Sequence, residues 1–289
     1  MELKKYENIE QFANENLNLM LEKEWLNCLM VGNCLDGLKE ESDDWLLAKV
    51  AENNKTELII LYRKPWKLLL YSPTNNKSDK LFRYTAEEIY KIDPNLLGVN
   101  TEKEIANKFA KYYCEISDFK FRTHKPLRIL LLTKMKTANL NEELIFRKAN
   151  INDKPILIKF IKDFFEEASE EKYTSKEIEE KFNSYIKKEY YVIEKESKIV
   201  SQAVISRDLK KGKCISGVYT PKEERGKGYA YNLIYRVSKK ALDEGAEYCV
   251  LYTDDENPIS NHVYEKIGYH RMVDCEDIEF YKEKNNHVK

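Results

Sequence analysis

Residues 214–230 read Cys-Ile-Ser-Gly-Val-Tyr-Thr-Pro-Lys-Glu-Glu-Arg-Gly-Lys-Gly-Tyr-Ala, and the rest of the chain is interpreted from them. The first, apolar part is typical of a strand, and a short polar loop then leads into a helix. The segment Arg225-Gly-Lys-Gly228 falls where the loop becomes the helix. Backbone N–H groups at a helix N-terminus lack intrahelical partners, and the helix dipole favours an anion there. Because glycine has no Cβ, an anion can approach this backbone closely, so the stretch predicts a phosphate-binding site.

Three kinds of phosphate site are candidates for this loop. A nucleoside-triphosphate P-loop requires Gly-Lys followed by Ser or Thr, whereas Lys227 is followed by Gly228. A dinucleotide fingerprint requires a third glycine three residues after the second, and Tyr231 stands there. The third candidate is Arg-x-x-Gly-x-Ala at the end of a late strand, here Arg225 to Ala230, which is a pyrophosphate site for coenzyme A.

A second block follows after one helix and one strand. The helix after Gly228 has a continuous apolar face and should end near Gly245. Strand 247–253 then follows, and a β-α-β crossover implies that it is parallel to strand 214–220, with a right-handed connection. Asn257-Pro258 predicts an N-cap with proline at the first helical position, and Gly268 should end that short helix.

With these two blocks in view, the chain resembles the GNAT N-acetyltransferase superfamily over about residues 144–282. The resemblance depends on Val218-Tyr-Thr-Pro221, on Arg225-Gly-Lys-Gly-Tyr-Ala230, and on Asn257-Pro-Ile-Ser-Asn-His-Val-Tyr264 with Gly268 and Tyr269 after it. More faintly, the whole chain resembles two-domain members whose N-terminal half is a degenerate copy of the same fold. The runs Asn95–Asn100 and Phe109–Tyr113 support that, although the first half lacks the glycine loop.

The resemblance implies an α/β (α+β) fold of tandem acyl-CoA N-acyltransferase-like domains. Each domain has a mixed, mostly antiparallel sheet flanked by helices, and in the C-terminal domain strand 214–220 splays from strand 247–253. The expected domains are 1–138, the degenerate GNAT-like domain, and 139–289, the N-acetyltransferase domain. Acetyl-CoA is the implied cosubstrate, and no metal is expected.

The resemblance also implies the site residues. Backbone groups on strand 214–220 would pair with the pantetheine amides, N–H groups of the glycine loop would hold the pyrophosphate, and Asn257 would reach the pantetheine from the other side. Tyr264 would stand near the sulfur as the general acid. The implied cofactor-binding residues are Val218, Tyr219, Thr220, Arg225, Gly226, Lys227, Gly228, Tyr229, Ala230, Tyr231 and Asn257.

Alternative interpretations stay open for these residues. Gly226 and Gly228 also suit an ordinary turn between strand and helix, and Tyr264 also suits a core aromatic position. A base for the amine is not identifiable, because Cys214-Ile-Ser-Gly carries no carboxylate where many family members place one. A water chain or an unassigned carboxylate such as Glu256 could take that role.

Composition limits the class of protein. The chain has 289 residues, 42% of them hydrophobic, which is enough for two domains with sizeable cores. With 49 basic and 50 acidic residues the net charge is −1, so no bulk attraction to nucleic acid or to an anionic membrane is expected. The six cysteines form no C-x-x-C pair, which disfavours structural zinc. The N-terminus has no apolar signal core and no run is long enough for a membrane span, so we expect a cytoplasmic protein.

The first half predicts an α/β layer without a motif of its own. A helix is expected over 7–38, ended or broken by Gly32 or Gly37, and strands at 45–50 and 57–63 should flank a turn at Asn53-Asn54-Lys55. Further expected elements are a strand at 66–71, helices at 84–91 and 101–116, and a strand at 127–134. Thr101 is the expected N-cap of the second of these helices, with Glu104 in capping-box position.

The second half begins after a polar connector at 135–143. We expect a strand from Leu144, a helix starting near Asn152, a charged helix at about 174–188, and strands at 190–195 and 199–206 joined by a turn at Glu196-Ser-Lys198. The last strands are expected within 269–282.

The sequence therefore predicts an acetyl-CoA-dependent N-acetyltransferase that transfers an acetyl group to a primary amine directly, in a ternary complex. The acceptor would be a small-molecule or peptide amine, and the protein a monomer or homodimer. A non-catalytic acyl-CoA sensor or partner-binding module is the alternative, and transfer of another acyl group is a third hypothesis. The first domain, which has no motif, is expected to shape the acceptor cleft or cover a sheet edge.

Overall fold

The computed structural model describes residues 1–39, 45–169 and 173–283. The chain forms two compact units. The first comprises Met1–Ile129, Asp254–Glu256 and Val273–Lys289, and the second Leu130–Thr253 and Asn257–Met272. Within the described ranges, no helix has the length and apolar character needed to cross a membrane.

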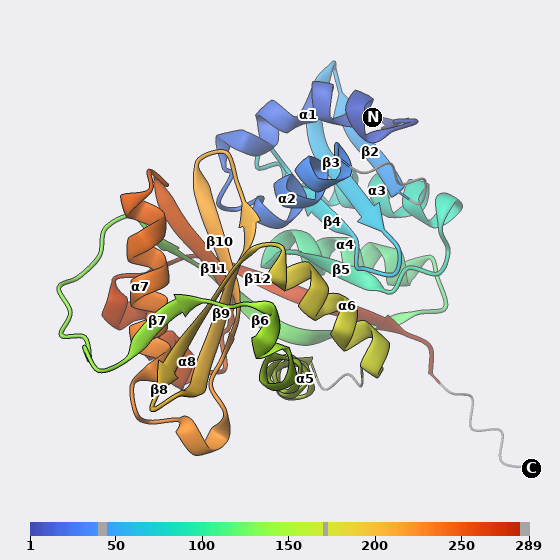
Figure 1. The fold of residues 1–289 in the computed structure, drawn as a ribbon. Helices are drawn as coiled ribbons and strands as arrows, with labels where there is room; N and C mark the ends of the chain where they lie inside the picture. Colours follow the sequence, from blue (N-terminus) through green and yellow to red (C-terminus); the bar gives the residue numbers. More distant parts are fainter. Residues whose placement is uncertain (40–44, 170–172, 284–289) are drawn as a thin grey trace, which may run out of the picture. The chain divides into compact units, whose positions relative to one another are not determined.

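The order of helices and strands is the same in both halves of the sequence (Figure 1). The first half consists of β1 (Glu2–Lys5), α1 (Ile9–Glu22), α2 (Cys28–Gly37), β2 (Trp45–Glu52), β3 (Lys55–Arg63), β4 (Leu69–Tyr71), α3 (Asp79–Ile92), β5 (Gly98–Glu102), α4 (Lys103–Glu115) and β6 (Lys120–Leu132). The second half consists of β7 (Ile145–Lys148), α5 (Lys154–Ser169), α6 (Ser175–Ile186), β8 (Glu189–Lys195), β9 (Lys198–Asp208), β10 (Gly212–Tyr219), α7 (Tyr229–Asp243), β11 (Tyr248–Asp254), α8 (Pro258–Ile267) and β12 (His270–Tyr281). Short 3-10 helices, η1 (Ile151–Asp153) and η2 (Lys222–Glu224), precede α5 and α7.

The first unit contains a four-stranded antiparallel sheet in the order β1-β2-β3-β4. The turn expected at Asn53-Asn54 is confirmed, and both residues have positive φ, 53° and 63°, as a two-residue hairpin turn requires. Strand β5 pairs with β12 through Cys275–Glu279, and an isolated parallel bridge, Leu68↔Val99, joins β5 to the residue that precedes β4.

Two predictions in the first half are wrong. The helix expected over 7–38 does end at Gly37, the last residue of α2, but it is not broken at Gly32, which lies inside α2. Instead α1 ends at Glu22, because the buried Asn27 side chain donates its amide to the carbonyls of Met20 and Lys23, at 3.0 and 3.2 Å, and closes the turn there.

Thr101 is not an N-cap. It lies in β5, opposite Glu276 of β12, and its hydroxyl group donates to the Leu70 carbonyl oxygen at 2.5 Å. Glu102 takes the N-cap position of α4, and its side chain makes no capping hydrogen bond to the first turn of the helix. The local capping pattern is thus overridden by a strand pairing that is more than 170 residues distant in sequence.

The second unit contains the strand order β11-β10-β9-β8-β7, and the strand beside β11 on its other side is β6. Strands β7 to β10 are antiparallel to their neighbours, whereas β10 and β11 are parallel, as expected. Each half of the sequence therefore exchanges its last strand: β12 pairs with β5, and β6 lies next to β11. For this reason neither compact unit is one continuous range of the sequence, because Val273–Lys289 belong to the same unit as the N-terminal residues. The domains expected from the sequence were the continuous ranges 1–138 and 139–289.

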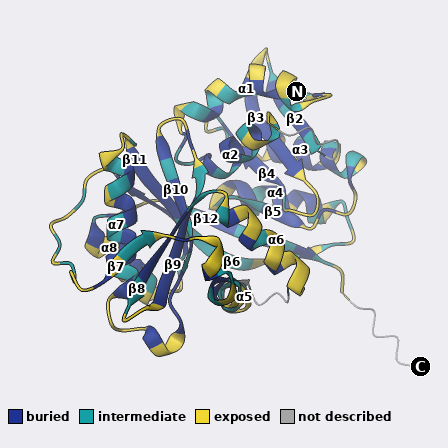
Figure 2. Ribbon diagram, viewed as in Figure 1, coloured by how far each residue is buried: buried dark blue, intermediate teal, exposed yellow. Residues whose placement is uncertain are grey.

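Helices cover both faces of this second sheet (Figures 1 and 2). Apolar side chains of α7 and α8 form one core cluster with alternate residues of the strands, including Leu233, Ile267 and Ile215. Side chains of α5 and α6, such as Phe160 and Phe182, form a second cluster with residues of the opposite face, such as Val204. Successive strand residues point to opposite faces, so β10 contributes to both clusters.

We predict that Gly212→Ala lowers the free energy of unfolding by about 1–3 kcal/mol, the usual cost of overpacking. An added Cβ at Gly212 would lie 2.2 Å from the Tyr248 ring, at the pair where β10 and β11 begin their parallel pairing. Urea denaturation measures the loss. In a Tyr248→Ala background the same substitution should cost less. Equal costs in both backgrounds would show that the ring is not the obstacle.

Candidate functional site

Strands β10 and β11 are paired only at their starts. The parallel register consists of Gly212↔Tyr248, Lys213↔Cys249 and Cys214↔Val250, and no later pair occurs between the described residues of these strands. Beyond Cys214, the edge of β10 that faces β11 therefore lacks ladder partners. Unpaired strand edges are templates for an added extended chain, so this segment can accept a ligand that hydrogen-bonds as a strand does.

A β-bulge interrupts β10 at the same level. Along β9 the pairing moves from Val204 to Gln202, while along β10 it moves from Ser216 to Tyr219, so one extra residue is present on β10. Gly217 adopts φ 60°, a left-handed conformation that glycine accepts at little cost. An isolated glycine inside an expected strand is a signal for a bulge, and it was available in the sequence.

Next to the bulge, Val218 and Tyr219 point to opposite faces of the sheet. Val218 packs against the cluster on the α7 face. The Tyr219 ring packs edge-on against Phe160 on the α5 face, and its hydroxyl group donates to Glu167 at 3.1 Å. Thr220 directly follows the strand, and its hydroxyl group is 2.9 Å from that of Ser201. The three residues expected to bind pantetheine are thus consecutive along the unpaired edge.

The Arg225 side chain closes the loop that follows the strand. Its Nε donates to the Thr220 carbonyl oxygen at 2.9 Å, and its Nη2 donates to the Glu167 carboxylate at 2.7 Å. Sequence reasoning did not include Glu167, because it lies on α5, 58 residues away. Arg225 therefore holds the loop in shape, and its charge is matched by a carboxylate.

Lys227 is also paired, with Glu224 at 2.8 Å, and Lys198 contacts the other oxygen of the same carboxylate at 2.6 Å. These two ammonium groups lower the pKa of Glu224 to about 2. Arg225 and Lys227, the two cations of this loop, are therefore already engaged with Glu167 and Glu224.

The start of α7 provides backbone donors instead. Gly226 and Gly228 both have positive φ, 78° and 79°, and a Cβ at Gly226 would meet no atom within 4 Å. Gly228 is the N-cap and no side chain bonds to the first turn, so the N–H groups of Tyr229, Ala230 and Tyr231 face the helix N-terminus without a side-chain cap. This arrangement fits a pyrophosphate, which needs close approach to exposed N–H groups at a positive helix end.

Asn257 begins α8. Its side-chain oxygen accepts from the Ser260 N–H at 3.1 Å, with Pro258 at the first helical position, and Gly268 follows the helix with φ 124°, as expected. Asn257 is exposed, and its cap bond uses the oxygen, which leaves the amide nitrogen for other contacts.

Tyr264 lies on α8 in the same core cluster as Val218. Its ring packs edge-on against Tyr269, whose hydroxyl group bonds to Ser238 at 2.8 Å. Burial raises the pKa of Tyr264 to about 12. The phenol is therefore protonated at neutral pH, as a proton donor must be.

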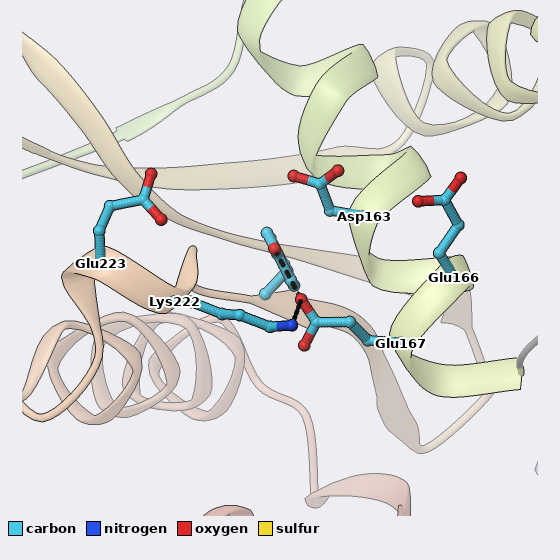
Figure 3. A pocket seen from close by; sticks show the side chains of 6 residues that line it. Asp163, Glu166, Glu167, Lys222 and Glu223 are labelled. Atoms are coloured by element: carbon cyan, nitrogen blue, oxygen red, sulfur yellow. Dashed lines mark hydrogen bonds and ion pairs between the residues drawn. The ribbon is translucent and has the colours of Figure 1, made fainter.

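A cavity of about 410 Å³ adjoins the end of β10 (Figure 3). Asp163, Glu166 and Glu167 point toward it from α5, and Lys222 and Glu223 lie across from them; Tyr219 also lines it. Four carboxylates against one ammonium group make this cavity unsuitable for a pyrophosphate.

No three His, Cys, Asp or Glu side chains in the described parts of the chain gather in a way that could hold a metal ion.

Residues 157–269 match the model of the acetyltransferase (GNAT) family. This segment is a GNAT domain. It contains β10, the glycine loop, α7, β11 and α8, together with every residue of the candidate site. A search of curated proteins found no significant match.

Solved structures show the same fold at low identity. A GNAT-family acetyltransferase from Colwellia psychrerythraea aligns with TM-score 0.60 and 12% identity, over 98% of this chain and 100% of that one. A Drosophila protein aligns with TM-score 0.66 and 11% identity, over 98% and 99% of the two chains. A GCN5-related N-acetyltransferase from Sphaerobacter thermophilus aligns with TM-score 0.61 and 14% identity, over 86% and 85%. The first two cover both halves of this chain.

We predict that the Glu224 carboxyl group titrates with a pKa of about 2, measured by carboxyl ¹³C NMR. Because the folded pKa is lowered, its stabilising contribution is complete above the ordinary value of about 4.3 and is lost as pH falls toward 2. Lys198→Met and Lys227→Met should each raise this pKa. Lys239→Met, which removes the partner of Asp243, should leave it unchanged. An ordinary value in the unaltered protein would contradict the paired arrangement.

Proposed function

We propose that this GNAT protein is an N-acetyltransferase that transfers an acetyl group from acetyl-CoA to a primary amine, directly and in a ternary complex. The observation that carries the proposal is the continuity of two features. The unpaired edge of β10 leads, through Thr220 and the loop after it, into the uncapped N-terminus of α7. One feature suits the amides of pantetheine and the other suits a pyrophosphate, in the order in which coenzyme A carries them.

In this proposal the cofactor contacts are mostly backbone ones. Val218, Tyr219 and Thr220 pair with pantetheine, and the N–H groups of residues 226–231 hold the pyrophosphate. Arg225 and Lys227 support the loop through Glu167 and Glu224 rather than by direct charge. The free amide nitrogen of Asn257 reaches pantetheine from α8.

The chemistry requires few side chains. The amine nitrogen attacks the thioester carbonyl carbon, the C–S bond breaks, and the leaving thiolate takes a proton from the Tyr264 hydroxyl group. The Val218 N–H stabilises the developing oxyanion. The proton lost by the amine passes to water or to a carboxylate outside β10, since Gly212–Tyr219 contains none.

The absence of a carboxylate on β10 also favours a second candidate, an acyl-CoA-binding module without turnover. Two measurements distinguish the candidates: calorimetry with acetyl-CoA, and release of free thiol in the presence of a panel of small-molecule and peptide amines. Binding with thiol release supports the transferase. Binding without acetylation of any amine supports the module, and no binding contradicts both.

We predict that Gly228→Glu abolishes acetyl-CoA binding, because its side chain places bulk and negative charge at the N-terminus of α7. Gly245→Glu is a matched control at the other end of the same helix. There glycine also has positive φ, 100°, and an added Cβ meets nothing within 4 Å. Calorimetry should find acetyl-CoA binding retained in the control. Equal affinities in the two variants would place the pyrophosphate elsewhere.

We predict that Tyr264→Phe lowers turnover by about 10²–10³-fold, the effect of losing a general acid, and leaves the affinity for acetyl-CoA nearly unchanged. Tyr269→Phe removes a neighbouring buried hydroxyl group and should mainly affect stability. Because the pKa of Tyr264 is raised to about 12, ionisation of this phenol should not reduce kcat below about pH 10. Unchanged turnover in Tyr264→Phe would remove the residue from the mechanism.

A further inference from the structure

Two carbonyl groups at the bulge of β10 are held by side chains of β9. The Gln202 side-chain amide donates to the Gly217 carbonyl oxygen at 3.4 Å, and the Ser201 hydroxyl group donates to the Tyr219 carbonyl oxygen at 3.2 Å. Both side chains are fully buried. The bulge leaves Gly217 without a ladder partner on β9, so the Gln202 side chain supplies the donor that regular pairing would otherwise provide.

The orientation of the Gln202 side chain is fixed by a second hydrogen bond. The Tyr190 hydroxyl group, on β8, donates to the Gln202 side-chain oxygen at 2.5 Å. Burial raises the pKa of Tyr190, so this phenol keeps its proton. With the oxygen occupied as an acceptor, the amide nitrogen is left to face the Gly217 carbonyl oxygen, which can only accept. The orientation of the Gln202 amide is therefore determined by its two partners.

The direction of these carbonyl groups determines the direction of the next N–H groups. A peptide unit is planar and trans, so its C=O and N–H bonds point in opposite directions. The Gly217 carbonyl points to β9, and hence the Val218 N–H points away from β9, toward the side where β11 has diverged. By the same argument, Ser201 turns the Thr220 N–H toward that side.

We propose that Gln202 is a positioning residue for acyl transfer: it fixes the Gly217–Val218 peptide so that the Val218 N–H polarises the thioester carbonyl. Ser201 orients the Thr220 N–H in the same way, and this N–H binds pantetheine further along the chain. This inference rests on the proposed function, because it requires acetyl-CoA along the unpaired edge of β10. It assigns a specific role to a buried glutamine that touches no cofactor.

The test is the infrared band of the thioester carbonyl in acetyl-CoA labelled with ¹³C at that carbon, which needs no acceptor. Bound to the unaltered protein, the band should shift to lower wavenumber than in free acetyl-CoA. Gln202→Met has a similar shape but no amide, so at saturating acetyl-CoA it should lose most of the shift. Its affinity for CoA, which has no acyl group, should change less than about 3-fold.

Two further variants make the result specific. Tyr190→Phe keeps Gln202 but removes the hydroxyl group that orients its amide. This variant should lose part of the shift of the thioester carbonyl band. Ser201→Ala should keep the shift and instead weaken CoA binding. Thermal unfolding checks that each variant is folded, and Tyr190→Phe decides the matter if Gln202→Met does not fold.

The outcomes separate the inference from the proposed function. A full shift in both Gln202→Met and Tyr190→Phe, or no shift in the unaltered protein with acetyl-CoA bound, would overturn the positioning role and leave the transferase standing. Failure of the unaltered protein to bind acetyl-CoA would overturn both. Loss of the shift in Gln202→Met and Tyr190→Phe but not in Ser201→Ala is the result expected.

Discussion

The structure of the second unit depends on how few residues join β10 to β11. Parallel pairing stops after Cys214↔Val250, and the N–H and C=O groups of β10 that face β11 beyond that point need another partner. Leaving buried backbone groups unpaired costs about 1–3 kcal/mol each, so such a gap survives only where something else meets the demand. On the β9 side the ladder continues past the bulge, where Gln202 and Ser201 bond two carbonyl groups. On the β11 side the groups of β10 stay unpaired, and the proposed function assigns them to the cofactor.

The charges around the glycine loop serve the same purpose. Glu167 joins Arg225 and Tyr219, and Glu224 joins Lys198 and Lys227, so the loop is tied to α5 and to β9 by side chains. A loop ordered before binding loses less conformational entropy when a ligand arrives. In the proposed complex, the attraction for the pyrophosphate comes from the N–H groups of α7, which are fixed by the helix, and not from Arg225 and Lys227.

Local signals in the sequence predicted much of this. Asn53-Asn54, Asn257-Pro258 and Gly268 each act through their own backbone, so the turn, the cap and the helix end were all found in place. Thr101 failed because its partner, Glu276, belongs to the last strand of the chain. Glu167 and Gln202 were missed for a similar reason: their importance lies in which distant carbonyl or guanidinium group they meet. Gly217 is different, because a glycine inside an expected strand already indicates a β-bulge. Only the contacts that the bulge makes depend on β9.

The two halves share one order of elements, but the corresponding helices differ in how their N-termini are capped. Helix α3 of the first half corresponds to α7 of the second, each connecting the fourth strand of its half to the fifth. The start of α3 is capped by Ser78, whose hydroxyl group accepts from the Leu81 N–H, whereas α7 starts at Gly228 with no side-chain cap. When the N-cap side chain accepts a hydrogen bond from the first turn of its helix, fewer backbone N–H groups are left to bind an anion. The Ser78 hydroxyl group therefore occupies an N–H donor of α3, whereas the corresponding donors of α7 are the ones that the proposed function assigns to the pyrophosphate.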